Sequence, residues 1–165
     1  MLYGCDSLVD GGETVFLQPK SVTFRFEFPS ESVSPNTEAS VPSAASVDLG
    51  PLVAQDGYTK SNVISVQIES AELRRRQPPN VNLNFIRDVE VFLQGPGGGA
   101  VSVATLGSPP AATSGNLQVT GGRDVATQVT GQNFSARLDF VPTNVLPDED
   151  YELEVTLRLR IEVEG

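Results

Sequence analysis

The stretch from residue 151 to residue 164 alternates apolar and polar residues without interruption, and it constrains the fold more than any other part of the chain. Successive side chains of a β-strand point to opposite faces of a sheet. The pattern therefore predicts one long strand with a buried face and a wet face. A parallel sheet covered on both sides reads as continuously apolar, so the alternation favours an antiparallel sheet. The apolar set is Tyr151, Leu153, Val155, Leu157, Leu159, Ile161 and Val163.

Shorter alternating segments predict further strands, and Gly- and Pro-rich segments separate them. The segment 62–69 places Ile64, Val66 and Ile68 on its core face, and residues 124–129 form the one helical turn we expect, capped by Asp124. Residues 30–46 are interpreted as a loop. We expect an all-β protein, a single antiparallel β-sandwich of Ig-like or jelly-roll-like Greek-key type, with seven to eight strands and at most one short helical turn. The other predicted strands are residues 21–28, 47–49, 88–94, 100–106, 117–120 and 132–141.

Composition narrows the function classes. A chain of 165 residues with 39% apolar residues makes one ordinary domain with a real core. The formal net charge of −10 disfavours nucleic-acid binding, which depends on Lys and Arg neutralising phosphates. The chain contains no His, which removes the commonest general base near neutral pH and the commonest metal ligand. We expect no enzyme activity, no catalytic residues, no metal site, no cofactor and no nucleic-acid partner.

The sole cysteine, Cys5, follows Leu2, Tyr3 and Gly4. A Leu three residues before a Cys, with a small residue directly before it, resembles the lipobox of bacterial lipoproteins. That resemblance implies cleavage before Cys5 and a lipid on its thiol, which would anchor the chain to a membrane. We expect residues 1–19 to form this lipobox-like start and a flexible polar tether, and residues 20–165 to form the sandwich domain. The alternative is an unmodified thiol in a cytoplasmic protein.

The layout of residues 61–164 is similar to small envelope lipoproteins of Bacteroidota-type bacteria. Three stretches carry the resemblance: residues 62–69, residues 82–91 (NLNFIRDVEV), and the closing strand after Pro147-Asp148. The resemblance implies a β-sandwich of undefined activity, held in the bacterial cell envelope at the outer membrane, in the periplasm or facing the surface. Its partners would be the membrane and other envelope proteins.

Five residues are candidates for a contact surface. Arg74, Arg75 and Arg76 form the one basic cluster, suited to anionic groups or, as edge charges, to preventing strand-to-strand aggregation. Tyr58 follows a turn and Phe92 faces away from Val91 and Leu93, so both are candidate exposed aromatics. The sequence leaves three functions open. They are a non-enzymatic envelope lipoprotein domain, a self-assembling subunit of an extracellular fibre, shell or surface layer that pairs by strand addition, and a carbohydrate-binding module.

Overall fold

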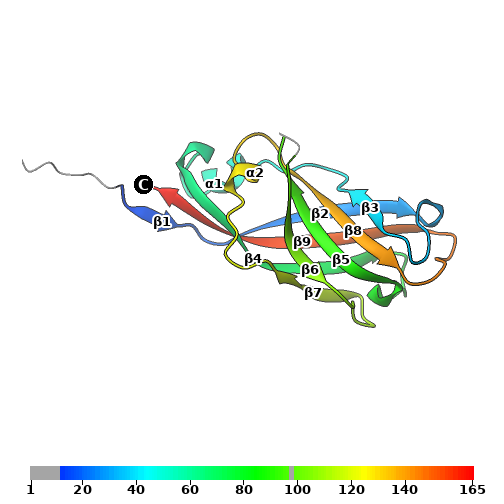
Figure 1. Cartoon of the computed structure of the whole chain (residues 1–165). Helices are drawn as coiled ribbons and strands as arrows, with labels where there is room; N and C mark the ends of the chain where they lie inside the picture. Colours follow the sequence, from blue (N-terminus) through cyan, green and yellow to red (C-terminus); the bar gives the residue numbers. More distant parts are fainter. Residues whose placement is uncertain (1–11, 97–98) are drawn as a thin grey trace, which may run out of the picture.

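The computed structural model describes residues 12–96 and 99–165, which form an antiparallel β-sandwich (Figure 1). The all-β prediction is confirmed, and these residues form nine strands where seven to eight were expected. The strands are β1 (Thr14–Phe16), β2 (Lys20–Pro29), β3 (Ala39–Pro42), β4 (Val63–Gln77), β5 (Ile86–Gln94), β6 (Ala100–Leu106), β7 (Ser114–Val119), β8 (Ser135–Pro142) and β9 (Asp150–Glu164).

The strands follow one continuous hydrogen-bonded path in the order β1-β9-β4-β7-β6-β5-β8-β3, and β2 also pairs with β9. Every pairing is antiparallel. Strand β7 joins the two sheets, because its first residues pair with β4 and its last residues pair with β6. Strands β1, β2, β9 and β4 form the first sheet, and β6, β5, β8 and β3 form the second.

Strand β9 confirms the alternation read from the sequence. Each of its seven inward side chains, from Tyr151 to Val163, is at most 1% exposed. Three phenylalanines of β2 extend the same buried layer, and they meet aromatic rings of the second sheet. The ring centroids of Phe24 and Phe134 lie 5.9 Å apart, and those of Phe28 and Phe140 lie 5.1 Å apart. The core therefore lies between the two sheets.

Two strands were absent from the sequence prediction. Strand β1 falls inside the segment interpreted as a tether, so the sandwich begins before residue 20. Strand β3 falls inside the predicted loop 30–46 and pairs with β8. Both are three or four residues long, and Val41 is the one buried apolar side chain they supply. The predicted strand 47–49 is limited to a single bridge between Val47 and Phe134.

Strand β4 corrects one core prediction. Val66 and Ile68 are buried as expected, but Ile64 is 43% exposed. The register of β4 against β9 shifts between Val63 and Ser65, which marks a β-bulge. A bulge adds one residue to one strand and breaks strict alternation, so the inward face predicted for Ile64 is wrong.

Two short helices replace the single predicted helical turn. Helix α2 (Ala126–Val129) lies where a turn was expected, and Asp124 Oδ1 accepts a hydrogen bond from the Ala126 N–H at 2.9 Å. Helix α1 (Gly50–Ala54) was not expected, because Gly50-Pro51 read as a strand terminator. Proline fits the first turn of a helix, where its missing N–H has no partner to lose. Three single-turn 3₁₀ segments complete the fold: η1 (Ser30–Ser32), η2 (Lys60–Asn62) and η3 (Leu83–Phe85).

The molecule is elongated along β9, and its two ends differ (Figure 1). At the proximal end, β1 pairs with the last residues of β9, Thr14 opposite Glu164. At the distal end, β2 finishes opposite the first residues of β9, Pro29 opposite Asp150. The fifteen residues of β9 separate these ends by about 46 Å at about 3.3 Å per residue.

Candidate functional site

The chain joins the sandwich at the proximal end through β1. The Leu17 N–H donates to the Ile161 carbonyl at 2.9 Å, and the Gly165 N–H donates to the Glu13 carbonyl at 2.9 Å. These bonds extend the β1–β9 pairing at both of its ends. Cys5, the predicted lipidation site, lies outside the described residues. Gly12 lies against the Glu164 side chain at this same end.

The Arg74–Arg76 cluster does not form an open basic patch. Arg74 Nη2 lies 3.3 Å from Glu72 Oε1, and Arg76 Nε lies 3.8 Å from Glu154 Oε2. Arg75 points the other way, and its Nε donates to the Val81 carbonyl at 2.8 Å. Strand β4 pairs with β9 on one side and, from residue 71 to residue 74, with β7 on the other. Strand β7 therefore covers this edge of β4 as far as Arg74, and Arg76 lies beyond it. Arg74 and Arg76 balance nearby carboxylates.

The two candidate aromatic residues lie on different parts of the fold. Tyr58 follows α1, is partly buried and packs against the core. Phe92 lies on the outer face of β5, where the Arg137 guanidinium covers its ring at 4.2 Å from the centroid. Arg137 makes a two-pronged ion pair with Asp139 at 3.0 and 3.2 Å, and Ser40 donates to Asp139 at 2.6 Å. Phe92 therefore packs against a polar network, Arg137–Asp139–Ser40, that links β8 to β3.

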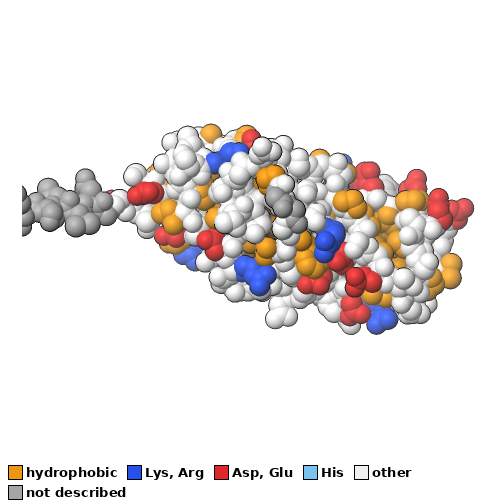
Figure 2. All heavy atoms as spheres, turned by 45° about the horizontal axis from the view of Figure 1, so that its top comes forward, with side chains coloured by type: hydrophobic (Ala, Val, Ile, Leu, Met, Phe, Trp, Pro, Cys, Tyr) orange, Lys and Arg blue, Asp and Glu red, His pale blue; other side chains and the backbone are white. Residues whose placement is uncertain are grey.

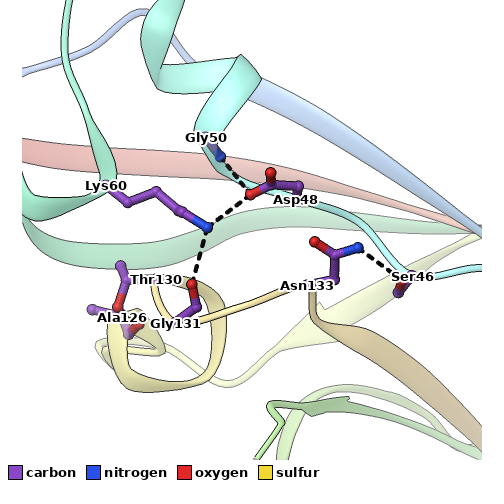
Figure 3. A network of polar contacts seen from close by, with 8 residues as sticks. All are labelled: Ser46, Asp48, Gly50, Lys60, Ala126, Thr130, Gly131 and Asn133. Carbon is purple, nitrogen blue, oxygen red and sulfur yellow. Dashed lines mark hydrogen bonds and ion pairs between the residues drawn. The ribbon is translucent and has the colours of Figure 1, made fainter.

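Both lysines of the chain hold the α1 segment at the proximal end. Lys60 Nζ donates to Asp48 Oδ1 at 3.0 Å and to the Gly131 carbonyl at 2.9 Å, which joins three loops (Figure 3). Lys20 Nζ lies 2.6 Å from Asp56 Oδ2. The Gly50 N–H, followed by Lys60, lowers the pKa of Asp48 below its ordinary value of 3.8. Neither lysine was predicted to have this role, because the ion pairs join positions far apart in the sequence.

An open pocket of about 560 Å³ lies at the distal end, lined by the last residues of β2 and β4 and the first residues of β9. Glu27 and Glu152 stand directly opposite each other in register, an arrangement of like charges that destabilises a sheet. Arg25 offsets part of this repulsion, because its Nε lies 3.7 Å from Glu152 Oε1 and 3.7 Å from Glu154 Oε2. Acidic side chains gather at this end, to the right in Figure 2. The full lining is Glu27, Phe28, Pro29, Gln77, Asp150, Tyr151 and Glu152.

The buried tyrosine beneath this end carries an unsatisfied hydroxyl. Tyr151 is 1% exposed, and its Oη has no hydrogen-bond partner within residues 12–96 and 99–165. Its ring stacks on Phe28 at a centroid distance of 5.4 Å and contacts Phe85 at 5.2 Å. Burial, followed by the nearby charge of Glu149, raises the pKa of Tyr151 above 10.0. The sequence identified Tyr151 as a core residue but gave no sign of this unmet hydrogen bond.

The chemistry available at the pocket is that of carboxylates, which attract cationic groups and accept hydrogen bonds. Within residues 12–96 and 99–165, no three His, Cys, Asp or Glu side chains are arranged to hold a metal ion. In the same part of the chain, no helix has the length and apolar character needed to cross a membrane.

Comparisons with known proteins identify no family. No protein-family model matches the chain, and no curated protein matches it. Among solved structures, those of the Gx and Gt strains of infectious bursal disease virus align at TM-scores of 0.40 and 0.39, with 14% and 13% sequence identity. Each alignment covers 90% of this chain, which spans 32% and 34% of the two viral chains, about a third of their length.

Proposed function

We propose that this chain is a non-enzymatic domain of the bacterial cell envelope, anchored to a membrane by a lipid on Cys5 and acting through binding or as a structural element. The observation that carries the proposal is the pairing of β1 with the end of β9. This pairing puts Thr14, nine residues after Cys5 in the sequence, at one end of the elongated sandwich. A domain anchored there would present its distal end, with the acidic pocket, about 46 Å beyond its proximal end.

The test is the intact mass of the protein isolated from the membrane fraction of its own host. We expect a mass that corresponds to the loss of residues 1–4 and the addition of acyl chains at Cys5. A Cys5→Ser variant is the matched control and should remain unmodified in the soluble fraction. An unmodified wild-type chain in the soluble fraction would overturn the proposal.

A second candidate is a self-assembling subunit, and the edge of β1 favours it. Strand β1 ends the path of the first sheet, and all three of its residues are exposed. An exposed apolar edge can accept a strand from another molecule. The C-terminal end of β9 cannot accept a further strand, because β1 and β4 already pair with its two edges. Light scattering tests this candidate, since assembly through β1 predicts a molar mass that rises with protein concentration.

A further inference from the structure

Three strands of the described residues, β1, β2 and β3, each pair with a single other strand, so each has one open edge. An open edge presents unpaired N–H and carbonyl groups to other molecules, and folded proteins usually cover or blunt it. The edge of β2 is covered, because the Ala44 N–H donates to the Arg25 carbonyl at 2.8 Å. Residues 44–47 lie beside residues 23–25, with which they line a small pocket, and Val47 then bridges to Phe134.

The open edge of β3 is blunted by a proline. The Ser43 N–H donates to the Ala136 carbonyl of β8 at 2.8 Å, so the backbone groups of Ser43 face β8. Neighbouring residues of a strand alternate in direction, which turns the backbone of Pro42 toward the open edge. Proline has no N–H to offer a further strand, and edge prolines of this kind discourage pairing.

The open edge of β1 has neither form of protection. The Leu17 N–H donates to the Ile161 carbonyl at 2.9 Å, so the backbone groups of Leu17 face β9. By alternation those of Val15 also face β9, whereas those of Thr14 and Phe16 face away from it. No strand within residues 12–96 and 99–165 pairs with this edge, and β1 contains no charged residue or proline that would blunt it.

A second copy of the chain fits this edge through two-fold symmetry. When β1 of one copy runs antiparallel to β1 of the other, with Val15 at the two-fold axis, Thr14 of each copy lies opposite Phe16 of the other. Each such pair exchanges both of its backbone hydrogen bonds, so every open group of the two edges gains a partner. The side chains that meet are uncharged, so no like charges oppose each other within the paired strands.

The charges beside the edge are also complementary in this arrangement. The Arg160 guanidinium lies 4.0 Å from the centroid of the Phe16 ring, so it extends from β9 over β1. Thr14 is opposite Glu164. Glu164 of the other copy therefore lies two strand spacings, about 10 Å, from Phe16 on the same face. Arg and Glu side chains are long enough to close that gap, and the symmetry forms the Arg160–Glu164 pair twice.

We propose that two copies of the chain associate through β1, which joins their first sheets into one antiparallel sheet across a two-fold axis at Val15. The inference deepens the self-assembly candidate described above and rests on it. The contact uses the same edge on both copies, and the edges of β2 and β3 are protected, so assembly stops at a dimer. A strand of three residues makes a small contact, so we expect the dimer only at high protein concentration.

A cysteine cross-link tests the register. In a Cys5→Ser background, Val15→Cys places the two new thiols in a non-hydrogen-bonded pair whose Cα atoms lie about 4.5 Å apart, a separation that a disulfide can bridge. Mild oxidation of the full-length variant should give a disulfide-linked dimer at least tenfold faster than the matched control, Val145→Cys. Val145 is 80% exposed, against 40% for Val15, but it lies in the loop before β9. Equal rates at the two positions would overturn the proposal.

Sedimentation equilibrium of the Cys5→Ser chain tests whether assembly closes. The molar mass should rise with concentration from 17.6 kDa and level off at twice that value. Phe16→Pro removes the edge N–H without removing a bond to β9, and it should weaken association at least tenfold. Phe16→Ala keeps the N–H and is the matched control, which should weaken association less than threefold. Circular dichroism checks that both variants are folded.

Each of the other outcomes counts against a different part of the inference. Equal weakening by the two Phe16 variants would overturn the strand pairing, because the side chain and not the backbone would then make the contact. A mass that passes twice the monomer value without levelling off would overturn the two-fold closure and leave open assembly in place. A mass of 17.6 kDa at every concentration would overturn both the dimer and the self-assembly candidate. The lipid anchor is tested separately by the intact mass.

Discussion

Replacing Tyr151 with Phe should stabilise the protein. The Tyr151 side chain is 1% exposed, and its Oη lacks a hydrogen-bond partner in the part of the chain that the structure describes. A buried polar group without a partner costs about 1–3 kcal/mol, and the substitution removes the hydroxyl while keeping the ring that stacks on Phe28. No protein hydrogen bond is lost in exchange. We therefore expect the free energy of unfolding to rise by about 1 kcal/mol or more.

Urea denaturation at pH 8, followed by circular dichroism, measures this change. With a slope of about 2 kcal/mol per molar urea, a gain of about 1 kcal/mol moves the midpoint upward by about 0.5 M. Tyr58→Phe is the matched control, since Tyr58 is only partly buried, and it should shift stability by less than about 0.5 kcal/mol. The slope itself should stay unchanged in both variants.

Alkaline pH should enlarge the effect. The pKa of Tyr151 in the folded state lies above its ordinary value of 10.0, chiefly because of burial. Below pH 10 the phenol is neutral in both the folded and the unfolded state, and wild-type stability falls as the pH rises from there through the folded-state pKa, because the unfolded state ionises first. Tyr151→Phe cannot ionise, so the gap between variant and wild type should widen above pH 10. A destabilised variant at pH 8, or a gap that narrows above pH 10, would refute the reasoning.

Three further predictions concern the same urea measurement. Leu157→Ala should lower the free energy of unfolding by about 3 kcal/mol, because Leu157 is fully buried. Arg158→Ala, on the exposed face, should lower it by less than about 1 kcal/mol. Similar losses in the two variants would contradict the assignment of faces. Asp124→Ala should lower the free energy of unfolding by about 1–3 kcal/mol, because Asp124 Oδ1 accepts hydrogen bonds from two backbone N–H groups, each at 2.9 Å. An unchanged urea midpoint would show that these hydrogen bonds do not contribute to stability. The pKa of Asp48 is lowered, so its contribution to stability is present above pH 3.8 and is lost as the pH falls through its folded-state pKa. Asp48→Asn should therefore make the free energy of unfolding fall less steeply with decreasing pH in the acid range. An identical pH dependence in variant and wild type would contradict the prediction.

The long alternating runs were predictable because their periodicity comes from the backbone itself. Strand β9 buries every residue that its pattern assigns to the core, and β2 does the same from Val22 to Phe28. The position of Ile64 was not predictable, because a bulge depends on how two strands meet. Strand β3 was missed because Ser, Ala and Pro give no strand signal, and its pairing with β8 holds it in place.

The candidate sites were less predictable than the fold. Residue type alone suggested that Phe92 and Arg76 were free to bind, but their neighbours come from strands distant in the sequence. Arg137 reaches Phe92 from β8, and Glu154 reaches Arg76 from β9. The distal pocket also depends on contacts between distant parts of the sequence, because the β2–β9 register brings Glu27 opposite Glu152. Periodicity determines which face a side chain occupies, whereas strand order determines what it contacts.

The way β1 joins β9 has a mechanical consequence. The three residues of β1 run antiparallel to the end of β9, with Thr14 outermost and opposite Glu164. Tension applied through the preceding chain, directed away from the domain, would act along the axis of β1. Its hydrogen bonds to β9, and the bond from the Leu17 N–H to the Ile161 carbonyl, would then bear the load together in shear instead of opening one at a time. A strand of only three residues can therefore resist a pull along its axis much better than its length suggests.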